Sequence, residues 1–236
     1  MRTKFLLPLC LLVPGLPAHA VVLASYDFTS GPEDTSGSLL VTADDYDPRS
    51  AAVGGDDSAT STGTGTAFMR AENTPDTTNP DGHNFYHSFT LTVDGLGAGQ
   101  TLDLTSLTYD YFITSPSNGS ASLNYFTGIY SPTTGIADLS GKLGGYSFIG
   151  LTQTADSDVV NDVVDLTSAN GVAGSAFTGL GNGSSVEFRI YFGDTSSSNG
   201  RIHRIDNLEV NGTVVPEPGA TLLGAFGLTL LLRRRR

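Results

Sequence analysis

The chain has 236 residues, with 12 Lys and Arg against 24 Asp and Glu, 29 Gly, one Cys and no Trp. A hydrophobic content of 39% with only 15% charged residues excludes a chain kept unfolded by its charge, and the length favours one folded domain with processing segments. The formal net charge of −12 excludes nucleic acid as a natural partner, because a phosphate backbone repels an acidic body.

The first 20 residues, MRTKFLLPLCLLVPGLPAHA, are typical of a secretory signal peptide. A basic start precedes an apolar run, and the small residues Ala18 and Ala20 predict cleavage by signal peptidase before Val21. The alternative, a buried N-terminal helix, conflicts with the three prolines of this segment. Because Cys10 leaves with the peptide, we expect an exported mature chain that folds without disulfides.

The body, residues 21–214, is more acidic than the whole chain. Two of the 12 basic residues lie in the signal segment and four at the C-terminal end, and Glu217 lies beyond the body, which leaves 6 basic residues against 23 acidic ones. Short apolar runs alternate with Gly, Asn, Asp, Ser and Pro, and this pattern predicts strands rather than helices. We expect strands at residues 21–28, 66–70, 85–93, 101–112, 121–130, 146–152, 159–166, 185–192 and 201–210.

Two of these segments show the alternation clearly. In residues 85–93, FYHSFTLTV, every second side chain is apolar or histidine, and in residues 186–192, VEFRIYF, the apolar residues oppose Glu187, Arg189 and Tyr191. One apolar and one polar face per strand predicts an all-β fold, a two-sheet antiparallel β-sandwich of the jelly-roll type. Residues 31–38, 44–65 and 71–82, rich in Asp, Ser, Thr, Gly and Pro, are predicted to be loops.

The end of the body, VEFRIYFGDTSSSNGRIHRIDNLEVNG, resembles the closing hairpin of jelly-roll bodies in exported proteins and the last strand of many carbohydrate-binding modules. The opening YDF fits the matching first strand. The resemblance implies a structural calcium between an acid near the first strand and the Asp of the last, here Asp27 and Asp206. The alternative is that both carboxylates make ordinary hydrogen bonds.

No motif for catalysis stands out. The chain lacks a G-x-S-x-G nucleophile motif, and its many carboxylates single out no acid–base pair, so we expect a protein that is not an enzyme. His83 and His87 are four apart, but on a strand they lie about 13 Å from one another, too far to share a zinc ion. His203 is expected to be a surface or packing residue. Saccharide binding requires aromatic platforms, and the candidates are Tyr109, Tyr111, Tyr125, Tyr130 and Tyr146.

The last 22 residues, 215–236, combine three features in order. Pro216, Glu217 and Pro218 form an extended segment that a protease can grip. The apolar tract 219–232 would span about 21 Å as a helix, less than the roughly 30 Å of bilayer hydrocarbon. The closing basic cluster would stay at the cytoplasmic face; it consists of Arg233, Arg234, Arg235 and Arg236.

This tail resembles the PEP-CTERM sorting signal of exported bacterial proteins. The resemblance implies a short transmembrane helix, cleavage by a membrane protease of the exosortase type, and delivery to the cell surface or an extracellular polysaccharide matrix. An uncleaved single-span anchor is the alternative. We therefore predict a signal peptide at 1–20, a β-sandwich at 21–214 and a sorting signal at 215–236, in a structural or binding protein associated with extracellular polysaccharide. A polysaccharide-degrading enzyme and a permanently anchored adhesin are the rival hypotheses.

Overall fold

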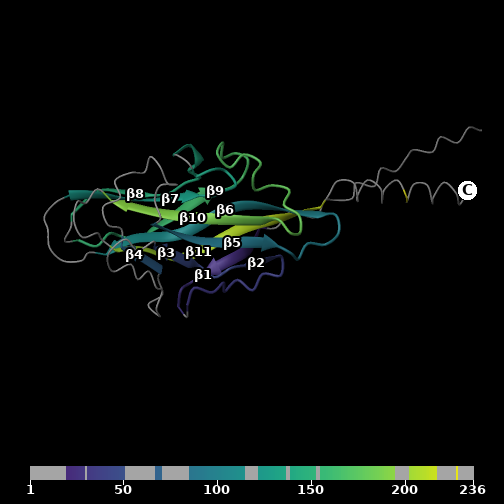
Figure 1. Ribbon diagram of the computed structural model, residues 1–236, viewed down its shortest axis with the longest axis horizontal. Helices are drawn as coiled ribbons and strands as arrows, with labels where there is room; N and C mark the ends of the chain where they lie inside the picture. Colours follow the sequence, from purple (N-terminus) through teal and green to yellow (C-terminus); the bar gives the residue numbers. More distant parts are fainter. Residues whose placement is uncertain are drawn as a thin grey trace, which may run out of the picture.

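The computed structural model describes residues 20–29, 31–50, 67–70, 85–114, 122–136, 139–152, 155–194, 202–216 and 227. In these residues two antiparallel sheets pack face to face (Figure 1). The sheet called A here has the order β1-β11-β6-β9, with β4 also paired to β11; the sheet called B has the order β2-β5-β10-β7-β8, with β3 also paired to β5. The predicted all-β two-sheet antiparallel sandwich is confirmed.

Sheet A contains β1 (Ala20–Tyr26), β4 (Ala67–Arg70), β6 (Gln100–Thr114), β9 (Val160–Asp165) and β11 (Ile202–Pro216). Sheet B contains β2 (Val41–Ala43), β3 (Asp47–Ser50), β5 (Phe85–Val93), β7 (Ser122–Tyr130), β8 (Ser147–Thr152) and β10 (Ser185–Asp194). A single turn of 3₁₀ helix, η2 (Leu139–Gly141), lies between β7 and β8. The first and last described strands pair side by side, so the two ends of the body meet in sheet A.

The core lies between the sheets and follows the alternation of the strands. In β10 the inward residues Val186, Phe188, Ile190 and Phe192 are all buried. Their partners include Leu23, Tyr26, Phe89, Leu91, Tyr109, Tyr111, Ile113, Tyr125, Phe177, Ile205 and Val210. Burial of this continuous apolar cluster is the main source of stability, since a chain with a single cysteine cannot form a disulfide within itself.

Two histidines lie inside this core, and each is bonded to a tyrosine. The Tyr46 hydroxyl lies 2.8 Å from Nδ1 of His87, and the Tyr111 hydroxyl lies 2.8 Å from Nδ1 of His203; both imidazoles are fully buried. The ring of Phe192 contacts both imidazoles, at centroid distances of 4.9 Å and 5.6 Å. His203 is therefore a packing residue, one of the two roles expected for it, while His83 lies outside the described residues.

Three differences from the predicted strands have physical reasons. Strands β2 and β3 were not predicted, because segments of 3 and 4 residues are too short to show alternation, and Pro48 argues against a strand. Within the described residues β3 pairs only with β5, an edge position that tolerates proline. Strand β11 continues past Val210 to Pro216. This is possible because residue 212 is glycine: a Cβ added at Gly212 would lie 2.5 Å from Cδ1 of Leu23, so any larger residue would collide with β1. The segment N-G therefore forms a bulge rather than a turn.

Candidate functional site

The outer face of sheet B carries a cluster of aromatic and cationic side chains, which we call the tyrosine–arginine patch. It consists of Tyr86 on β5, Tyr130 on β7, and Arg189 and Tyr191 on β10. Pairing places Tyr191 opposite Tyr86, and Arg189 opposite Tyr130. Because partners in antiparallel strands share a face, three strands contribute to one surface.

Arg189 is held in place by two neighbours. Its Nε donates to Oε1 of Glu187 at 2.6 Å, and its Cζ lies 4.6 Å from the centroid of the Tyr86 ring. Burial alone lowers the pKa of Arg189, but hydrogen bonds to Glu187 and Tyr191 and the charge of Glu187 outweigh it, so the pKa lies above its ordinary value. The guanidinium is a fixed cation stacked on an aromatic ring, with a side chain 19% exposed.

The three tyrosines of the patch form a continuous row. The Tyr191 ring lies 5.3 Å from that of Tyr86 and 5.3 Å from that of Tyr130. Tyr130 and Tyr191 are buried, whereas Tyr86 is half-buried and forms the accessible rim with Arg189 and Glu187. Gly128 makes the row possible, because a Cβ there would lie 2.8 Å from the Tyr130 ring.

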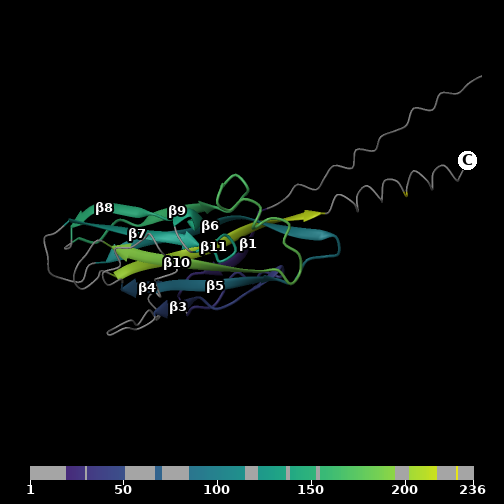
Figure 2. The ribbon, with the colours of Figure 1, turned by 45° about the horizontal axis from the view of Figure 1, so that its top comes forward.

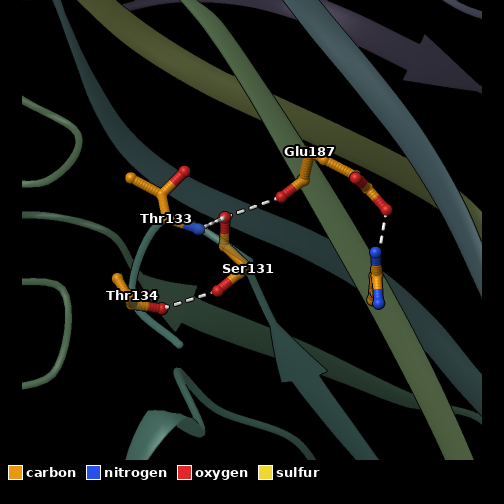
Figure 3. Close-up of polar contacts among 5 residues, drawn as sticks. Ser131, Thr133, Thr134 and Glu187 are labelled. Carbon is orange, nitrogen blue, oxygen red and sulfur yellow. Dashed lines mark hydrogen bonds and ion pairs between the residues drawn. The ribbon is translucent and has the colours of Figure 1, made fainter. Parts of the chain in front are cut away.

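A turn at the end of β7 fixes this corner of the patch. Ser131 is fully buried, and its hydroxyl donates to the backbone oxygen of Glu187 at 2.7 Å. Figure 3 shows this bond beside the contacts of Thr133 and Thr134, whose backbone N–H and hydroxyl donate to the hydroxyl and the carbonyl of Ser131. The turn therefore locks the end of β7 onto β10 just where Glu187 holds Arg189.

Most of the tyrosines predicted as platforms serve the core instead. Tyr109, Tyr111 and Tyr125 are fully buried, and the hydroxyl of Tyr109 donates to Asp162 at 2.7 Å. Tyr146 is half-buried and packs against the core, and only Tyr130 belongs to the patch. Sequence reasoning missed Tyr86 and Tyr191 as platforms, although both alternate with the apolar residues of their strands and so had to lie on an outer face.

The two predicted calcium ligands, Asp27 and Asp206, lie within reach of one another's charge. Burial raises the pKa of Asp206, and the charges of Asp110 and Asp27 raise it further. Asp110 lies directly opposite Asp206, and its two carboxylate oxygens accept from Asn161 at 3.2 Å and Asn207 at 2.8 Å. Hydrogen bonds from Thr29 to the Asp27 carboxylate lower the pKa of Asp27. In the described part of the chain no group of three or more His, Cys, Asp or Glu is arranged to hold a metal, so calcium stays a prediction.

Calcium binding has a direct test in thermal stability. If Asp27 and Asp206 share an ion, calcium at a hundredfold excess over its dissociation constant stabilises the fold by about 3 kcal/mol, and EGTA reverses this. Scanning calorimetry of the protein and of Asp206→Asn measures the effect, with Asp165→Asn as the control on the same face of sheet A. A melting temperature that calcium leaves unchanged in the unaltered protein would exclude the site.

The predicted processing residues lie at or beyond the limits of the described structure. Ala20 is the first residue of β1 and Pro216 the last residue of β11. Ala18, Glu217, Pro218 and the arginines at 233–236 lie outside the described residues. Within the residues that the structure describes, no helix is long and apolar enough to cross a membrane.

No protein-family model and no curated protein sequence matches this chain. Among solved structures, a carbohydrate-binding module that recognises mannan is similar at 13% identity and a TM-score of 0.37, over 82% of this chain and 98% of that one. The K1 adhesin domain of Lys-gingipain from Porphyromonas gingivalis has 15% identity and a TM-score of 0.33, over 81% and 97% of the two chains. The K3 adhesin domain has 14% identity and a TM-score of 0.34, over 80% and 99%. At these values the similarity assigns no residue of this chain a role.

Proposed function

We propose that this protein is an exported, non-catalytic β-sandwich that binds extracellular polysaccharide through the tyrosine–arginine patch and is sorted to the cell surface or the matrix by its PEP-CTERM tail. The observation that carries the binding function is the guanidinium of Arg189, stacked 4.6 Å from the Tyr86 ring centre and fixed by Glu187. The sorting function is supported by the three-part tail and by the signal peptide. The proposed processing enzymes are an exosortase-type protease for the tail and signal peptidase for the signal peptide.

The chemistry of the patch fits a sugar with an acidic substituent. The apolar face of a pyranose packs on a tyrosine ring, and Arg189 offers donors that match a carboxylate or a sulfate. The remainder of the protein would repel such a polymer, because residues 21–214 carry 6 basic residues against 23 acidic ones. Arg189, although its charge is balanced by Glu187, is the cationic group of the patch, and it directs an acidic sugar to the outer face of sheet B.

Substitution at the patch is expected to lower polysaccharide affinity. Tyr86→Ala removes the ring and Arg189→Ala the cation, and each should weaken binding about tenfold, equivalent to about 1.4 kcal/mol. Affinity electrophoresis in gels that contain the purified matrix polysaccharide of the host measures the change. Arg204→Ala is the matched control, since Arg204 is a half-buried arginine that bonds to Thr114 in sheet A. Equal retardation of all three variants would contradict the proposed site.

The rival hypotheses predict different results. A polysaccharide-degrading enzyme would release reducing ends from the same polymer. The proposed binding function predicts that no reducing ends are released. A permanently anchored adhesin would be found only in the membrane fraction with Arg233–Arg236 still attached. Intact mass of the protein from its host, fractionated into membrane and medium, distinguishes the anchored form from a sorted form that lacks residues 1–20 and the end of the tail.

A further inference from the structure

Both predicted processing points lie at one end of sheet A, on neighbouring strands. Ala20 pairs with Thr213, Val21 pairs with Gly212, and Pro216 pairs with Gln100 at the start of β6. Pro216 lies three positions beyond Thr213 on β11, so Ala20 and Pro216 lie about 11 Å apart at 3.3 Å per residue and 4.8 Å between strands. Figure 2 shows the yellow arrowhead of β11 beside the start of β6 at this end of the sandwich.

We infer that this paired end dictates the order and the limit of processing. The signal peptide must be cut before β11 pairs with β1, and the tail of the folded protein is cut only beyond Pro216. The part about the tail rests on the proposed sorting function, and the part about the signal peptide rests on the predicted cleavage before Val21 together with the pairing in sheet A. The sites concerned are the Ala20–Val21 bond and the bonds that follow Pro216, and the partners are two membrane proteases.

The reason is that a protease binds its substrate as an extended strand and forms backbone hydrogen bonds to it. The Ala20–Val21 bond lies between two residues already paired with β11, so its backbone is occupied once sheet A closes. Strand β11 is made last, near the end of the chain, so signal peptidase can act on β1 while β11 is still being synthesised or exported. Cleavage after folding would require β1 to detach, at a cost in free energy.

The same pairing limits the cut in the tail. Val215 pairs with Thr101, its carbonyl accepts from the Thr101 hydroxyl at 3.5 Å, and Pro216 is the last paired residue of the strand. The backbone up to Pro216, the first residue of the predicted Pro-Glu-Pro motif, is therefore part of the sheet. A mature protein cut in its folded state should keep Pro216 as part of its C-terminal end.

The end of sheet A that carries both processing points also orients the candidate binding face. On β10, Ser185 pairs with Thr92, near the short connection from β5 to Gln100, and Tyr191 lies six residues further along, about 20 Å away. Arg189 lies four residues from Ser185, about 13 Å along β10, so the tyrosine–arginine patch covers the middle of the outer face of sheet B and not the end that carries Ala20 and Pro216. A body held at the membrane by either segment would therefore present the patch on its side.

The first experiment uses the full chain, purified in detergent and folded, with signal peptidase added. We expect the folded protein to resist cleavage at Ala20–Val21 at least tenfold longer than the same protein in urea at a concentration the protease tolerates. A variant with Gly-Ser-Gly-Ser-Gly-Ser inserted between Ala20 and Val21 is the control, since its cleavage point lies outside β1 and should be cut in the folded state. Equal rates for the folded chain with and without the insertion would overturn the inference.

The second experiment trims the same folded chain with a nonspecific protease and maps both new termini by mass. We expect the resistant core to begin at or before Val21 and to end at or after Pro216. A core that starts within residues 22–26, or ends before Pro216, would show that these strand ends are open and would overturn the inference. Neither result depends on the exosortase, so a tail retained in the host would refute the proposed sorting while leaving these measurements to decide the inference.

Discussion

The free energy of unfolding is expected to fall steeply as the pH is lowered from 6.5 toward 4.5. His87 and His203 are fully buried, and burial lowers the pKa of each to about 3, with the neighbouring His203 adding to the effect on His87. In the unfolded chain both imidazoles titrate near 6.5. Below that pH the unfolded state binds two protons that the folded state excludes.

The sign and size of the effect follow from linkage. A depressed folded pKa leaves stability intact above pH 6.5, and stability is lost progressively as the pH falls from 6.5 to about 3. Each histidine lowers the free energy of unfolding by up to about 1.4 kcal/mol for each pH unit, so the two together lower it by up to about 2.7 kcal/mol per unit. The loss from pH 6.5 to 4 is therefore up to about 7 kcal/mol, so a domain at the lower end of the ordinary range of about 5–15 kcal/mol would be close to unfolding at pH 4.

Other groups titrate with different signatures. The carboxyls of Asp27 and Asp165 have lowered pKa values through hydrogen bonds to Thr29 and Thr167, so they reduce stability only in the more acidic range below that of an ordinary carboxyl. The raised pKa of Asp206 acts oppositely and adds stability as the pH falls. The change in the free energy of unfolding between pH 6.5 and pH 4.5 therefore comes mainly from protonation of the two histidines in the unfolded chain.

Urea unfolding followed by near-ultraviolet circular dichroism at a series of pH values measures this slope. The double variant His87→Asn, His203→Asn should be less stable at pH 7, yet its stability should change little between 6.5 and 4.5. The slope is the readout, so loss of packing does not obscure the result. An unaltered protein whose stability is constant over this interval would show that the imidazoles are protonated in the fold.

The positions of the core strands could be predicted from the local sequence pattern. The order of these strands in the two sheets could not. Phe188 and Ile190 alternate with Glu187 and Arg189, so their inward direction follows from the period of two alone. Which strands become neighbours depends on pairings across large separations, such as β10 with both β5 and β7. Alternation alone could not show that β10 pairs with β5 and β7. It also could not show that β2 and β3 lie at the edge of the sheet.

The candidate site was hidden for the same reason. Tyr86, Tyr130 and Arg189 are far apart in sequence, and each looks like an ordinary outward residue until pairing brings the three strands together. The core tyrosines were misjudged because a tyrosine with an inward ring can bury its hydroxyl when a partner is available, as Tyr111 does with His203. Composition shows how many tyrosines there are, and only the fold shows which of them reach the surface.

Phe192 is the packing residue that contacts both histidines, and its removal is expected to change both the stability of the fold and its dependence on pH. It is 4% exposed, and its ring lies between the two imidazoles. Phe192→Ala should lower the free energy of unfolding by about 3–5 kcal/mol through lost burial and an internal cavity. The cavity borders two polar rings and can admit water, which would raise both histidine pKa values and flatten the acid slope.

Phe126→Ala is the matched control for this change. Phe126 lies on the neighbouring strand β7, half-buried on the outer face, where its ring covers Gly193. Truncation there should cost about half as much, since solvent can fill the space, and should leave the acid slope unchanged. Urea unfolding of both variants at pH 7 and pH 5 separates the outcomes. If Phe192→Ala lost stability but kept the full slope, the histidines would owe their neutral state to Tyr46 and Tyr111 rather than to the dry packing that Phe192 provides.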